Sequence, residues 1–388
     1  MKILSIAASF IPSNTANSMQ VVKATQALTS LGHDVVLLVP GRQETSWDIL
    51  QTHYGLRTPF DIYWIPENLT FKRYDFAFKA LRFARQHDVD LVYTWMLQAA
   101  VLALWQGLPV VLELHDRVTG RFGPWLFRRF CSARTKKCLL TNTDALRHAL
   151  ISDFNLRPSS IDIKIAPNGV DLERYQGLPS PEIARQKLGL PEGFMAGYTG
   201  HFYQGRGIEL MMELARRMPE VQFLWVGGEP SDVNLWKKRL QKQNIRNVTM
   251  TGFVENARLP MYQAASDVLL MPYSTSIAGS GGGNSADVAS PMKMFEYLAA
   301  GRAILSSDLP VVHEVLDETT AVFCPPDDPG AWVEALNELR MDLSKREKLG
   351  RAARTASKRY TWCKRAERAL SGFITDTAQV KQELNEKP

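Results

Sequence analysis

Short aliphatic runs alternate with amphipathic segments of helical spacing along almost the whole of this 388-residue chain. Such alternation is typical of parallel sheets, because two parallel strands need a crossover connection, usually a helix, between them. The runs are continuous rather than alternating in polarity, as expected for strands that helices cover on both faces. The pattern therefore predicts an α/β protein built on doubly wound parallel sheets.

The first half contains six predicted strands, which are Lys2–Ala8, Val35–Val39, Leu91–Tyr93, Val110–Leu114, Cys138–Leu140 and Ile163–Ile165. Helical spacing predicts helices over Ser18–Leu31, which Gly32 closes, and over Leu97–Trp105. The alternation then stops over residues 166–181, whose Pro, Gly and Asn content suits a linker between domains.

The alternation restarts after this linker. The predicted strands are Met195–Thr199, Val221–Val226, Val248–Thr251, Val268–Met271 and Ala303–Ser306. The predicted helices are Gly207–Arg217, Leu235–Gln243, Leu259–Ala264, Pro291–Ala300 and Pro329–Arg340. Two domains are therefore expected, and because ligands of such sheets bind at the carboxyl ends of the strands, the cleft between the domains is the expected site.

Composition excludes several classes of protein. The chain has four cysteines, in no Cys-x-x-Cys pair and without a His cluster, so neither a metal site nor a disulfide framework is expected. The apolar start, Met1–Ala8, is predicted to be a buried strand rather than a signal peptide. The most apolar stretch, Met96–Leu114, contains Gln, Gly, Pro and Glu, which argues against a spanning helix. We therefore expect a cytoplasmic protein.

Positive charge is concentrated in the first half: residues 1–170 carry the whole formal net charge of +6. Residues 121–137 and 69–85 interleave basic and aromatic side chains. This composition suits a peripheral contact with an anionic membrane surface, with residues 121–137 as the contact. It also suits helices that pack an apolar side on the core and solvate their cations. No nucleic-acid-binding motif accompanies the charge, so a nucleic acid partner is not expected.

The most informative segment is Ala289–Gly301. Ser290 suits the N-cap, Pro291 suits the first helical position, and Gly301 suits the C-cap. A helix of about three turns is therefore predicted here, with its ends fixed by residue type.

The start of this helix predicts an anion site. The backbone amides of Met292 and Lys293 have no partner within the helix, and the helix dipole favours a negative charge beside them. Lys293 and Glu296 are three residues apart and project from one face. An ordinary amphipathic helix with a surface Lys–Glu pair explains the same spacing equally well.

The segment resembles the donor-binding helix of the retaining glycosyltransferases of family 4, also called group 1. In that family the stretch typically reads Ser-Pro-x-Lys-x-x-Glu-Tyr-x-Ala-x-Gly, and every fixed position is matched here. Further segments resemble the family in order and spacing: Leu31–Val35, Glu113–Asp116, Pro167–Asp171 and Tyr198–Gly207. The resemblance extends from residue 1 to about residue 370.

This resemblance implies a GT-B fold, in which two Rossmann-like domains face each other across a cleft. Residues 1–168 would form the acceptor side and residues 169–360 the nucleotide-sugar side. A C-terminal helix near Trp362–Phe373, within residues 361–388, would pack back on the first domain. The implied reaction is transfer of a hexosyl group from a nucleotide-diphosphate sugar to a glycan or lipid-linked acceptor. Configuration would be retained, without a metal or another cofactor.

The resemblance also implies roles for donor-site residues. Glu296 would bind the ribose, and the amides of Met292 and Lys293 would bind phosphate oxygens. Arg206 would neutralise the leaving diphosphate, and the backbone of Val254 would contact the base.

On the opposite side of the cleft, His115 would lie at the floor near the transferred sugar. Asn17, Ser18 and Met19, in the loop after the first strand, would border the acceptor or the diphosphate.

Two positions depart from the family. The first glutamate of its Glu-x7-Glu motif should fall at Val288, although Asp287 is adjacent, and its arginine after Gly200 is replaced by His201. Two further hypotheses therefore stay open: a catalytically silent nucleotide-sugar-binding subunit, and an epimerase or phosphorylase on the same scaffold.

Two other sequence features are weaker indications of a functional site. Asp88-x-Asp90 mimics the metal-binding pair of other glycosyltransferases but precedes its strand, away from the expected cleft. Residues 279–284, rich in glycine, lack the spacing of a dinucleotide fingerprint and are predicted to form a mobile loop over the donor.

Overall fold

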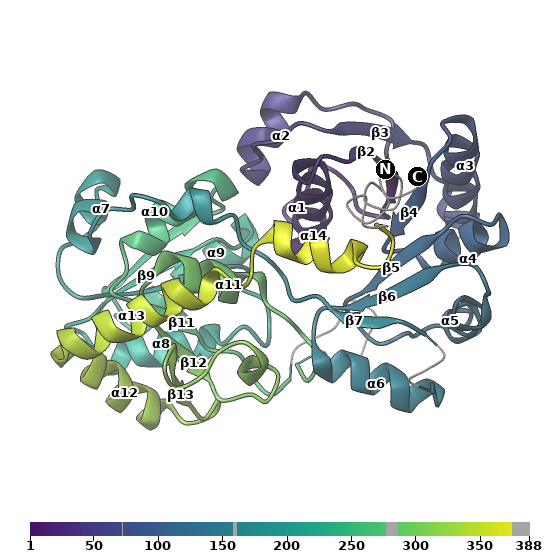
Figure 1. Cartoon of the computed structure of the whole chain (residues 1–388). Coiled ribbons are helices and arrows are strands. Elements are labelled where there is room, and N and C mark those ends of the chain that lie inside the picture. Colours follow the sequence, from purple (N-terminus) through teal and green to yellow (C-terminus); the bar gives the residue numbers. More distant parts are fainter. Residues whose placement is uncertain (72, 158–160, 277–285, 375–388) are drawn as a thin grey trace, which may run out of the picture.

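A computed structural model describes residues 1–71, 73–157, 161–276 and 286–374. Two lobes lie side by side, and each consists of a sheet with helices packed against it (Figure 1). Strands β1–β7 belong to the first lobe and strands β8–β13 to the second. The two lobes are called the first and the second domain below.

The first domain contains a seven-stranded sheet of order β3-β2-β1-β4-β5-β6-β7, in which every pairing is parallel. The strands are β1 (Lys2–Ile6), β2 (Asp34–Pro40), β3 (Asp61–Ile65), β4 (Leu91–Thr94), β5 (Val110–Leu114), β6 (Lys137–Thr141) and β7 (Ile163–Ile165). The helices are α1 (Ala16–Ser30), α2 (Trp47–Tyr54), α3 (Tyr74–Gln86), α4 (Leu97–Trp105), α5 (Gly123–Ser132) and α6 (Asp144–Phe154).

The second domain contains a six-stranded parallel sheet of order β10-β9-β8-β11-β12-β13. The strands are β8 (Met195–Thr199), β9 (Gln222–Val226), β10 (Val248–Gly252), β11 (Val268–Met271), β12 (Ala303–Ser307) and β13 (Ala321–Cys324). The helices are α7 (Pro181–Leu188), α8 (Ile208–Arg217), α9 (Pro230–Lys242), α10 (Leu259–Ala264), α11 (Met292–Ala300), α12 (Pro329–Met341) and α13 (Leu343–Ser357).

The strand order places the functional loops. It reverses between β1 and β4 in the first sheet and between β8 and β11 in the second. A crevice opens at such a reversal, outside the carboxyl ends of the strands. The loops after β1 and β8 therefore border the cleft, and Asn14, from the loop after β1, donates to the Glu229 carboxylate of the second domain at 3.5 Å.

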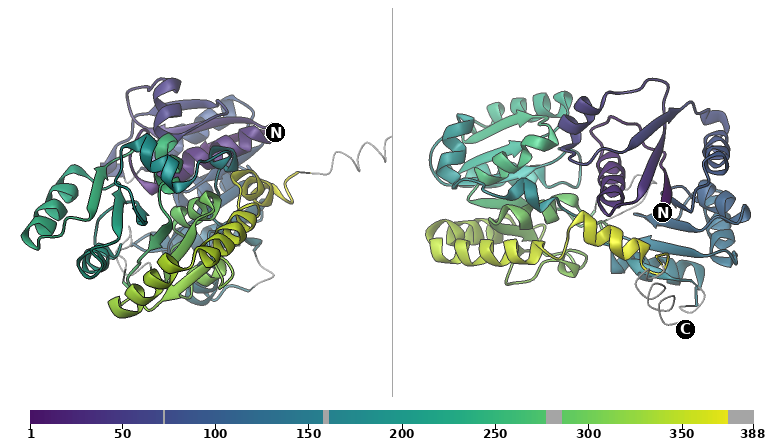
Figure 2. Two further views of the ribbon diagram at one scale, coloured as in Figure 1. Left: turned by 90° about the vertical axis from the view of Figure 1, so that its left-hand side faces the viewer. Right: turned by 45° about the horizontal axis from the view of Figure 1, so that its top comes forward.

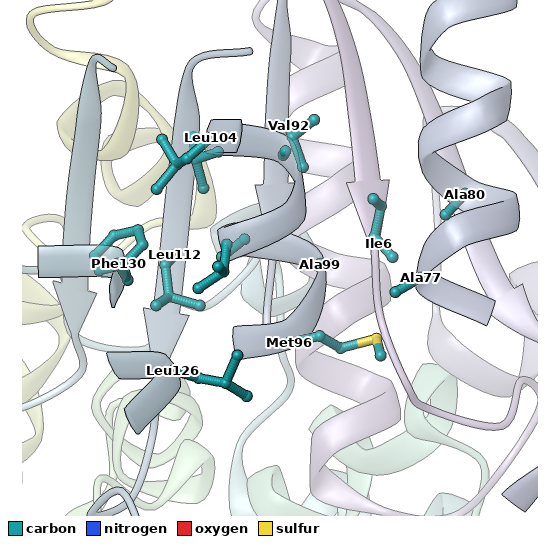
Figure 3. Close-up of a cluster of buried hydrophobic side chains, with 14 of the residues drawn as sticks. Ile6, Ala77, Ala80, Val92, Met96, Ala99, Leu104, Leu112, Leu126 and Phe130 are labelled. Atoms are coloured by element: carbon teal, nitrogen blue, oxygen red, sulfur yellow. The ribbon is translucent and has the colours of Figure 1, made fainter. Parts of the chain in front are cut away.

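Small side chains build the core under the first sheet. Ala77 and Ala80 of α3 and Ala99 of α4 are fully buried, and Figure 3 shows them beside the aliphatic side chains of the strands. Without bulk at these positions, both helices pack close to the strands and to each other.

The chain crosses between the domains twice, and the crossings touch. The backbone amide of Val170 donates to the carbonyl of Tyr360 at 2.9 Å. Gly169 lies so close to Trp362 that a Cβ added to the glycine would be 2.6 Å from the backbone nitrogen of Trp362. After the second crossing, α14 (Trp362–Leu370) packs on α1 of the first domain. Figure 1 and the right-hand view of Figure 2 show this yellow helix beside α1.

The structure corrects several predicted helix starts; α9, for example, begins at Pro230 rather than at Leu235. The sequence predicted a helix from Ser18, but α1 begins at Ala16, because the Thr15 side chain accepts a hydrogen bond from the Ser18 amide and acts as the N-cap. Strand β3 was not predicted. It lies at the sheet edge and is only partly covered, so it lacks the continuous aliphatic run of the central strands.

Gly207 precedes α8 and provides a test of this packing. Its φ is +74°, and an added Cβ would lie 1.7 Å from the carbonyl oxygen of Pro272. We expect Gly207→Ala to lower the free energy of unfolding by about 3 kcal/mol, through left-handed strain plus a backbone clash. The matched control is Gly32→Ala, where φ is +84° and no atom lies within 4 Å of the added Cβ. It should cost only about 1 kcal/mol. Equal losses in denaturant unfolding would contradict the packing argument.

Candidate active site

Helix α11 begins at the boundary between the domains. The sequence predicted Ser290 as its N-cap, but Pro291 occupies that position with an extended backbone, and the helix starts at Met292. The Ser290 hydroxyl has no hydrogen-bond partner among the described residues, and the Ser290 carbonyl accepts a 2.7 Å hydrogen bond from the Asn168 side chain. The predicted end is confirmed, since Gly301 adopts a left-handed conformation with φ +65°.

Two cations meet beside the start of α11. The ammonium of Lys293 lies 3.6 Å from the ring centre of Tyr198 and 5.4 Å from that of Tyr273. The guanidinium of Arg206, from the loop after β8, lies 5.2 Å from the same Tyr273 ring and also donates to the Tyr203 hydroxyl. Aromatic faces attract cations, so this cage holds both charges close together.

Neither cation is fully satisfied. Among the residues that the structure describes, the buried Lys293 Nζ and Arg206 Nε atoms have no hydrogen-bond partner. Burial lowers the pKa of Lys293 well below its ordinary value, and repulsion from Arg206 lowers it further, against the opposing effect of Glu296. An anion placed between the two side chains would relieve both the repulsion and the missing hydrogen bonds.

His201 borders the same cage. Burial lowers the pKa of its imidazole, and the charges of Arg206 and Lys293 add to this effect. The backbone of Asn14 also hydrogen-bonds to the imidazole, so the ring bridges the two domains. Gly200 precedes it, and an added Cβ there would lie 2.7 Å from Lys293 Nζ.

Glu296 lies one turn beyond Lys293. Its Oε2 atom accepts a 3.2 Å hydrogen bond from Gln263 of α10. The amide oxygen of Gln263 accepts in turn from the Tyr175 hydroxyl at 2.9 Å, so the amide orientation is fixed. Glu296 therefore presents a half-buried carboxylate held by one neutral donor.

A small cavity separates Glu296 from the first domain. Its lining residues are Met19, Lys23, Gly169, Val170, Asp171, Arg174, Asn256, Met292, Glu296 and Trp362. Lys23 is buried and pairs with Asp171 while donating to the Gly55 carbonyl at 2.8 Å. The cavity thus brings α1 of the first domain opposite α11 of the second.

His115 follows β5 on the first-domain side of the cleft. Its Nε2 atom contacts the Glu113 carboxylate, which also accepts from Gln20 at 2.8 Å and from Arg365 at 2.6 Å. Gln20 donates further to Asn168 at 2.8 Å, and Asn168 contacts Ser290 as described above. Hydrogen bonds therefore link His115 to the start of α11.

The three residues predicted to border the acceptor differ in position. All lie in the first turn of α1 rather than in a loop. Asn17 is exposed, and Met19 lines the cavity described above. Ser18 is buried, and its hydroxyl donates to the Ser13 carbonyl at 2.8 Å, so its side chain is used within the turn.

Val254, expected near the base, is half-buried in the loop after β10. Its neighbour Phe253 stacks on His53 of the first domain, with ring centres 5.7 Å apart. The two domains therefore touch at this end of the cleft as well.

Val288 occupies the position at which the family pattern has the first glutamate of its Glu-x7-Glu motif. It is buried in the hydrophobic core of the first domain, and its carbonyl accepts from Thr143 at 3.0 Å. Asp287 pairs with Arg117 of the first domain at 3.0 Å, away from the cation cage.

The described residues contain no group of three or more His, Cys, Asp or Glu side chains suited to a metal, and no helix long and apolar enough to cross a membrane. Asp90 accepts from the Lys2 amide at the amino end of the sheet, as its sequence position indicated. The glycine-rich stretch 279–284 lies outside the described residues.

Sequence reasoning missed several residues of the site, namely Gln20, Lys23, Tyr93, Asn168 and Arg365. One signal was available: Glu113 interrupts an aliphatic strand, and a buried carboxylate needs a cation or several donors. That rule demands a partner but does not name Arg365, 252 residues further along the chain.

Comparison with known families gives two matches. The model described as "Glycosyltransferase Family 4" matches residues 18–174, and the model described as "Glycosyl transferases group 1" matches residues 194–342. Each match falls in one of the two domains.

Individual relatives agree. The chain is 26% identical over 353 residues to the D-inositol 3-phosphate glycosyltransferase of Xylanimonas cellulosilytica, covering 87% of this chain and 74% of that protein. It is 25% identical over 190 residues to the putative teichuronic acid biosynthesis glycosyltransferase TuaH of Bacillus subtilis, covering 48% of this chain but only 45% of that protein.

Solved structures share the fold. The Anabaena protein HepE, crystallised with UDP, superposes with a TM-score of 0.71 at 18% identity, with all of both chains covered. At this identity the likeness demonstrates the GT-B fold, as the sequence resemblance predicted.

Lys293 offers a test of the cation cage. We expect Lys293→Met to raise the free energy of unfolding at neutral pH by about 1 kcal/mol or more, because a buried, repelled charge is replaced by a side chain of similar size. At pH values between the lowered pKa of Lys293 and its ordinary pKa, the unfolded wild-type chain binds more protons than the folded chain. The free energy of unfolding should therefore rise with pH across that interval. The variant should lose this rise.

The same variant should also lose the stabilisation that added pyrophosphate gives the wild type in a thermal shift assay. The exposed control Lys237→Met should change stability by less than about 0.5 kcal/mol and keep the pyrophosphate effect. A Lys293→Met protein that is less stable, yet still stabilised by pyrophosphate, would refute the anion site.

Proposed function

The chain belongs to glycosyltransferase family 4, the group 1 glycosyltransferases, and from this we propose that it transfers a hexosyl group from a nucleotide-diphosphate sugar to a glycan or lipid-linked acceptor, with retention of configuration. The observation that carries the donor proposal is the pair of cations at the start of α11. Lys293 and Arg206 share one aromatic ring while each keeps a buried N–H group without a partner among the described residues. A diphosphate supplies the charge and the acceptor oxygens that this pair lacks.

The positions of the neighbouring residues support the remaining contacts with the nucleotide sugar. In the proposal, the diphosphate also accepts from the amides of Met292 and Lys293, since the start of a helix favours an anion. Glu296, one turn further, accepts hydrogen bonds from the ribose hydroxyls, and the backbone of Val254 contacts the base. His201 faces the same cations and acts as a third, neutral phosphate ligand in place of the family's arginine.

The chemistry follows from the leaving group. When the glycosidic bond to the nucleotide breaks, negative charge develops on the phosphate oxygens. Arg206 and Lys293 are already in place, so the charge is stabilised without reorganisation, and removing one such donor typically costs about 3–4 kcal/mol of barrier. Because side-chain cations perform this task, the proposal requires neither a divalent metal nor another cofactor.

Two hypotheses compete with this proposal: a silent nucleotide-sugar-binding subunit, and an epimerase or phosphorylase on the same scaffold. Formation of a glycosylated acceptor by the purified chain distinguishes transfer from both. Retention is checked by the anomeric configuration of that product, and metal independence by activity in excess EDTA.

Donor identity is the first experimental question. We expect thermal-shift screening against UDP-, GDP-, ADP- and CDP-sugars to reveal one nucleotide that stabilises the fold by mass action. UDP-glucose is a reasonable first donor, since HepE was also crystallised with it.

With the identified donor, Glu296→Ala should weaken affinity about 10- to 100-fold, as expected for loss of hydrogen bonds to a charged acceptor. The exposed Glu209→Ala serves as a control on the same domain and should bind normally. If Glu296→Ala binds and turns over donor like the wild type, the ribose contact is wrong.

A membrane contact is a second part of the proposal, and α5 supports it. Leu126, Phe127 and Phe130 pack into the core, whereas Trp125 is 46% exposed and lies beneath the Arg129 guanidinium. The outer face of this helix thus combines an aromatic ring with cations, which suits an anionic lipid surface and a lipid-linked acceptor.

Charge reversal tests this contact. We expect Arg128→Glu/Arg129→Glu/Lys136→Glu to reduce co-sedimentation with phosphatidylglycerol-rich vesicles at least about tenfold, since each basic residue near such a surface contributes roughly 1 kcal/mol. Lys137 is left unchanged, because its ammonium already donates to the Ala133 carbonyl at 2.6 Å. Reversal of Lys237 and Lys238 on the second domain is the control. No binding by the wild type, or equal binding by all variants, would defeat the idea.

A further inference from the structure

Four side chains converge on the carboxylate of Glu113. Its Oε1 atom accepts from Arg365 at 2.6 Å and from Gln20 at 2.8 Å, and also contacts His115; its Oε2 atom accepts from the Tyr93 hydroxyl. Arg365 donates to the Tyr93 hydroxyl as well, at 3.1 Å. Glu113 and Arg365 are both buried, so this is a closed network rather than a surface ion pair.

The carboxyl of Glu113 is ionised at neutral pH. Burial by itself raises the pKa of this carboxyl, but the charge of Arg365 and the hydrogen bonds from Arg365 and His115 bring the pKa well below its ordinary value. The carboxylate is therefore ionised and acts as an acceptor at neutral pH. Its negative charge depends on Arg365, because a buried carboxylate without a cation is strongly unfavourable.

This acceptor fixes the tautomer of His115. The amide nitrogen of Gln20 lies 2.8 Å from Glu113 Oε1, from Asn168 Oδ1 and also from His115 Nε2, but it carries only two N–H groups, which the two oxygens accept. A carboxylate cannot donate, so His115 Nε2 must carry a proton and donate to Glu113. In the neutral ring Nδ1 is then unprotonated, and no described residue hydrogen-bonds to it.

The imidazole is also oriented toward the cleft. Its side chain is 24% exposed although Nε2 faces the enclosed carboxylate. Part of the ring is therefore accessible, and Nδ1 is the ring nitrogen that does not face Glu113. An unprotonated Nδ1 at the cleft floor can accept a hydrogen bond from a sugar hydroxyl or from the attacking acceptor.

The network depends on both domain crossings. Arg365 belongs to α14, which returns to the first domain after the second crossing, and Asn168 lies at the first crossing. Asn168 also donates to Ser290, directly before α11. The position of His115 is therefore tied to the helix that carries Lys293 and Glu296.

We infer that Arg365, Glu113 and Gln20 are positioning residues for glycosyl transfer, which hold His115 as the Nε2–H tautomer with Nδ1 turned to the bound sugar. The inference rests on the proposed function, because it assigns this orientation to the transfer step. None of the three residues needs to touch substrate: each acts through His115.

Three variants separate positioning from folding. Glu113→Gln keeps the shape of the side chain, but an amide can donate as well as accept and no longer fixes the tautomer. Arg365→Met leaves the carboxylate without its cation and is expected to be less stable. The double variant Glu113→Gln/Arg365→Met buries no unpaired charge and should recover most of that stability. Arg368→Met, one turn away on the exposed side of α14, is the control; it removes a 2.9 Å hydrogen bond to the Ile165 carbonyl but no contact of the Glu113 network.

We expect Glu113→Gln and the double variant to lower kcat about 100-fold, as misplacement of a catalytic group typically does, while the nucleotide dissociation constant changes less than about threefold. Arg368→Met should resemble the wild type in both. Arg365→Lys should restore part of the rate lost in Arg365→Met, since it returns the charge but not the second hydrogen bond. A double variant that recovers stability and transfer rate together would overturn the inference, because the network would then be structural only.

A spectroscopic readout works without any activity. In ¹⁵N-histidine-labelled wild-type protein, His115, assigned through His115→Gln, should show a protonated Nε2 and an unprotonated Nδ1. In the double variant this signature should be lost or mixed. The opposite tautomer in the wild type would refute the inference even if transfer is confirmed. The predicted signature without transfer from any donor would instead reject the proposed function and leave the arrangement of His115 intact.

Discussion

The enclosed carboxylate of Glu113 can exist only because the chain brings a cation back to it from 252 residues away. This requirement ties together β5, which carries Glu113, α14, which carries Arg365, and α1, which carries Gln20. A buried ion pair is weak evidence for stability, because desolvation offsets much of the attraction. Its effect here is geometric: α14 must lie on the first domain, so the two crossings between the domains run in contact.

The same geometry places the two halves of the site opposite each other. From Gln20, hydrogen bonds continue through Asn168 to Ser290, where α11 starts. On the far side of that start, Lys293 and Arg206 share the ring of Tyr273. The first domain thus supplies an acceptor-rich floor and the second domain a pair of cations. In the proposed function, a negative diphosphate meets the cations and a neutral sugar meets the floor.

Much of this could be predicted from the sequence, since the signals are local. Continuous aliphatic runs gave the central strands, and several predicted elements, including α4, β5 and β8, have the predicted bounds. The spacing from Lys293 to Glu296 and the left-handed Gly301 depend on residues within one helix. One error lies where a distant residue contacts the chain: Pro291 rather than Ser290 is the N-cap of α11, and the Ser290 carbonyl accepts from Asn168.

Local pattern and residue type therefore determined the α/β class, the two-domain order and the helix that begins the candidate anion site. Tertiary structure alone decided that Arg365 balances Glu113, that Val288 lies in the core of the first domain, and that Lys293 and Arg206 meet around one tyrosine. The physical reason is the separation along the chain over which each effect acts. Helix and strand preferences act over a few residues, whereas a buried charge is satisfied by whichever partner the crossing of the chain brings within hydrogen-bond distance.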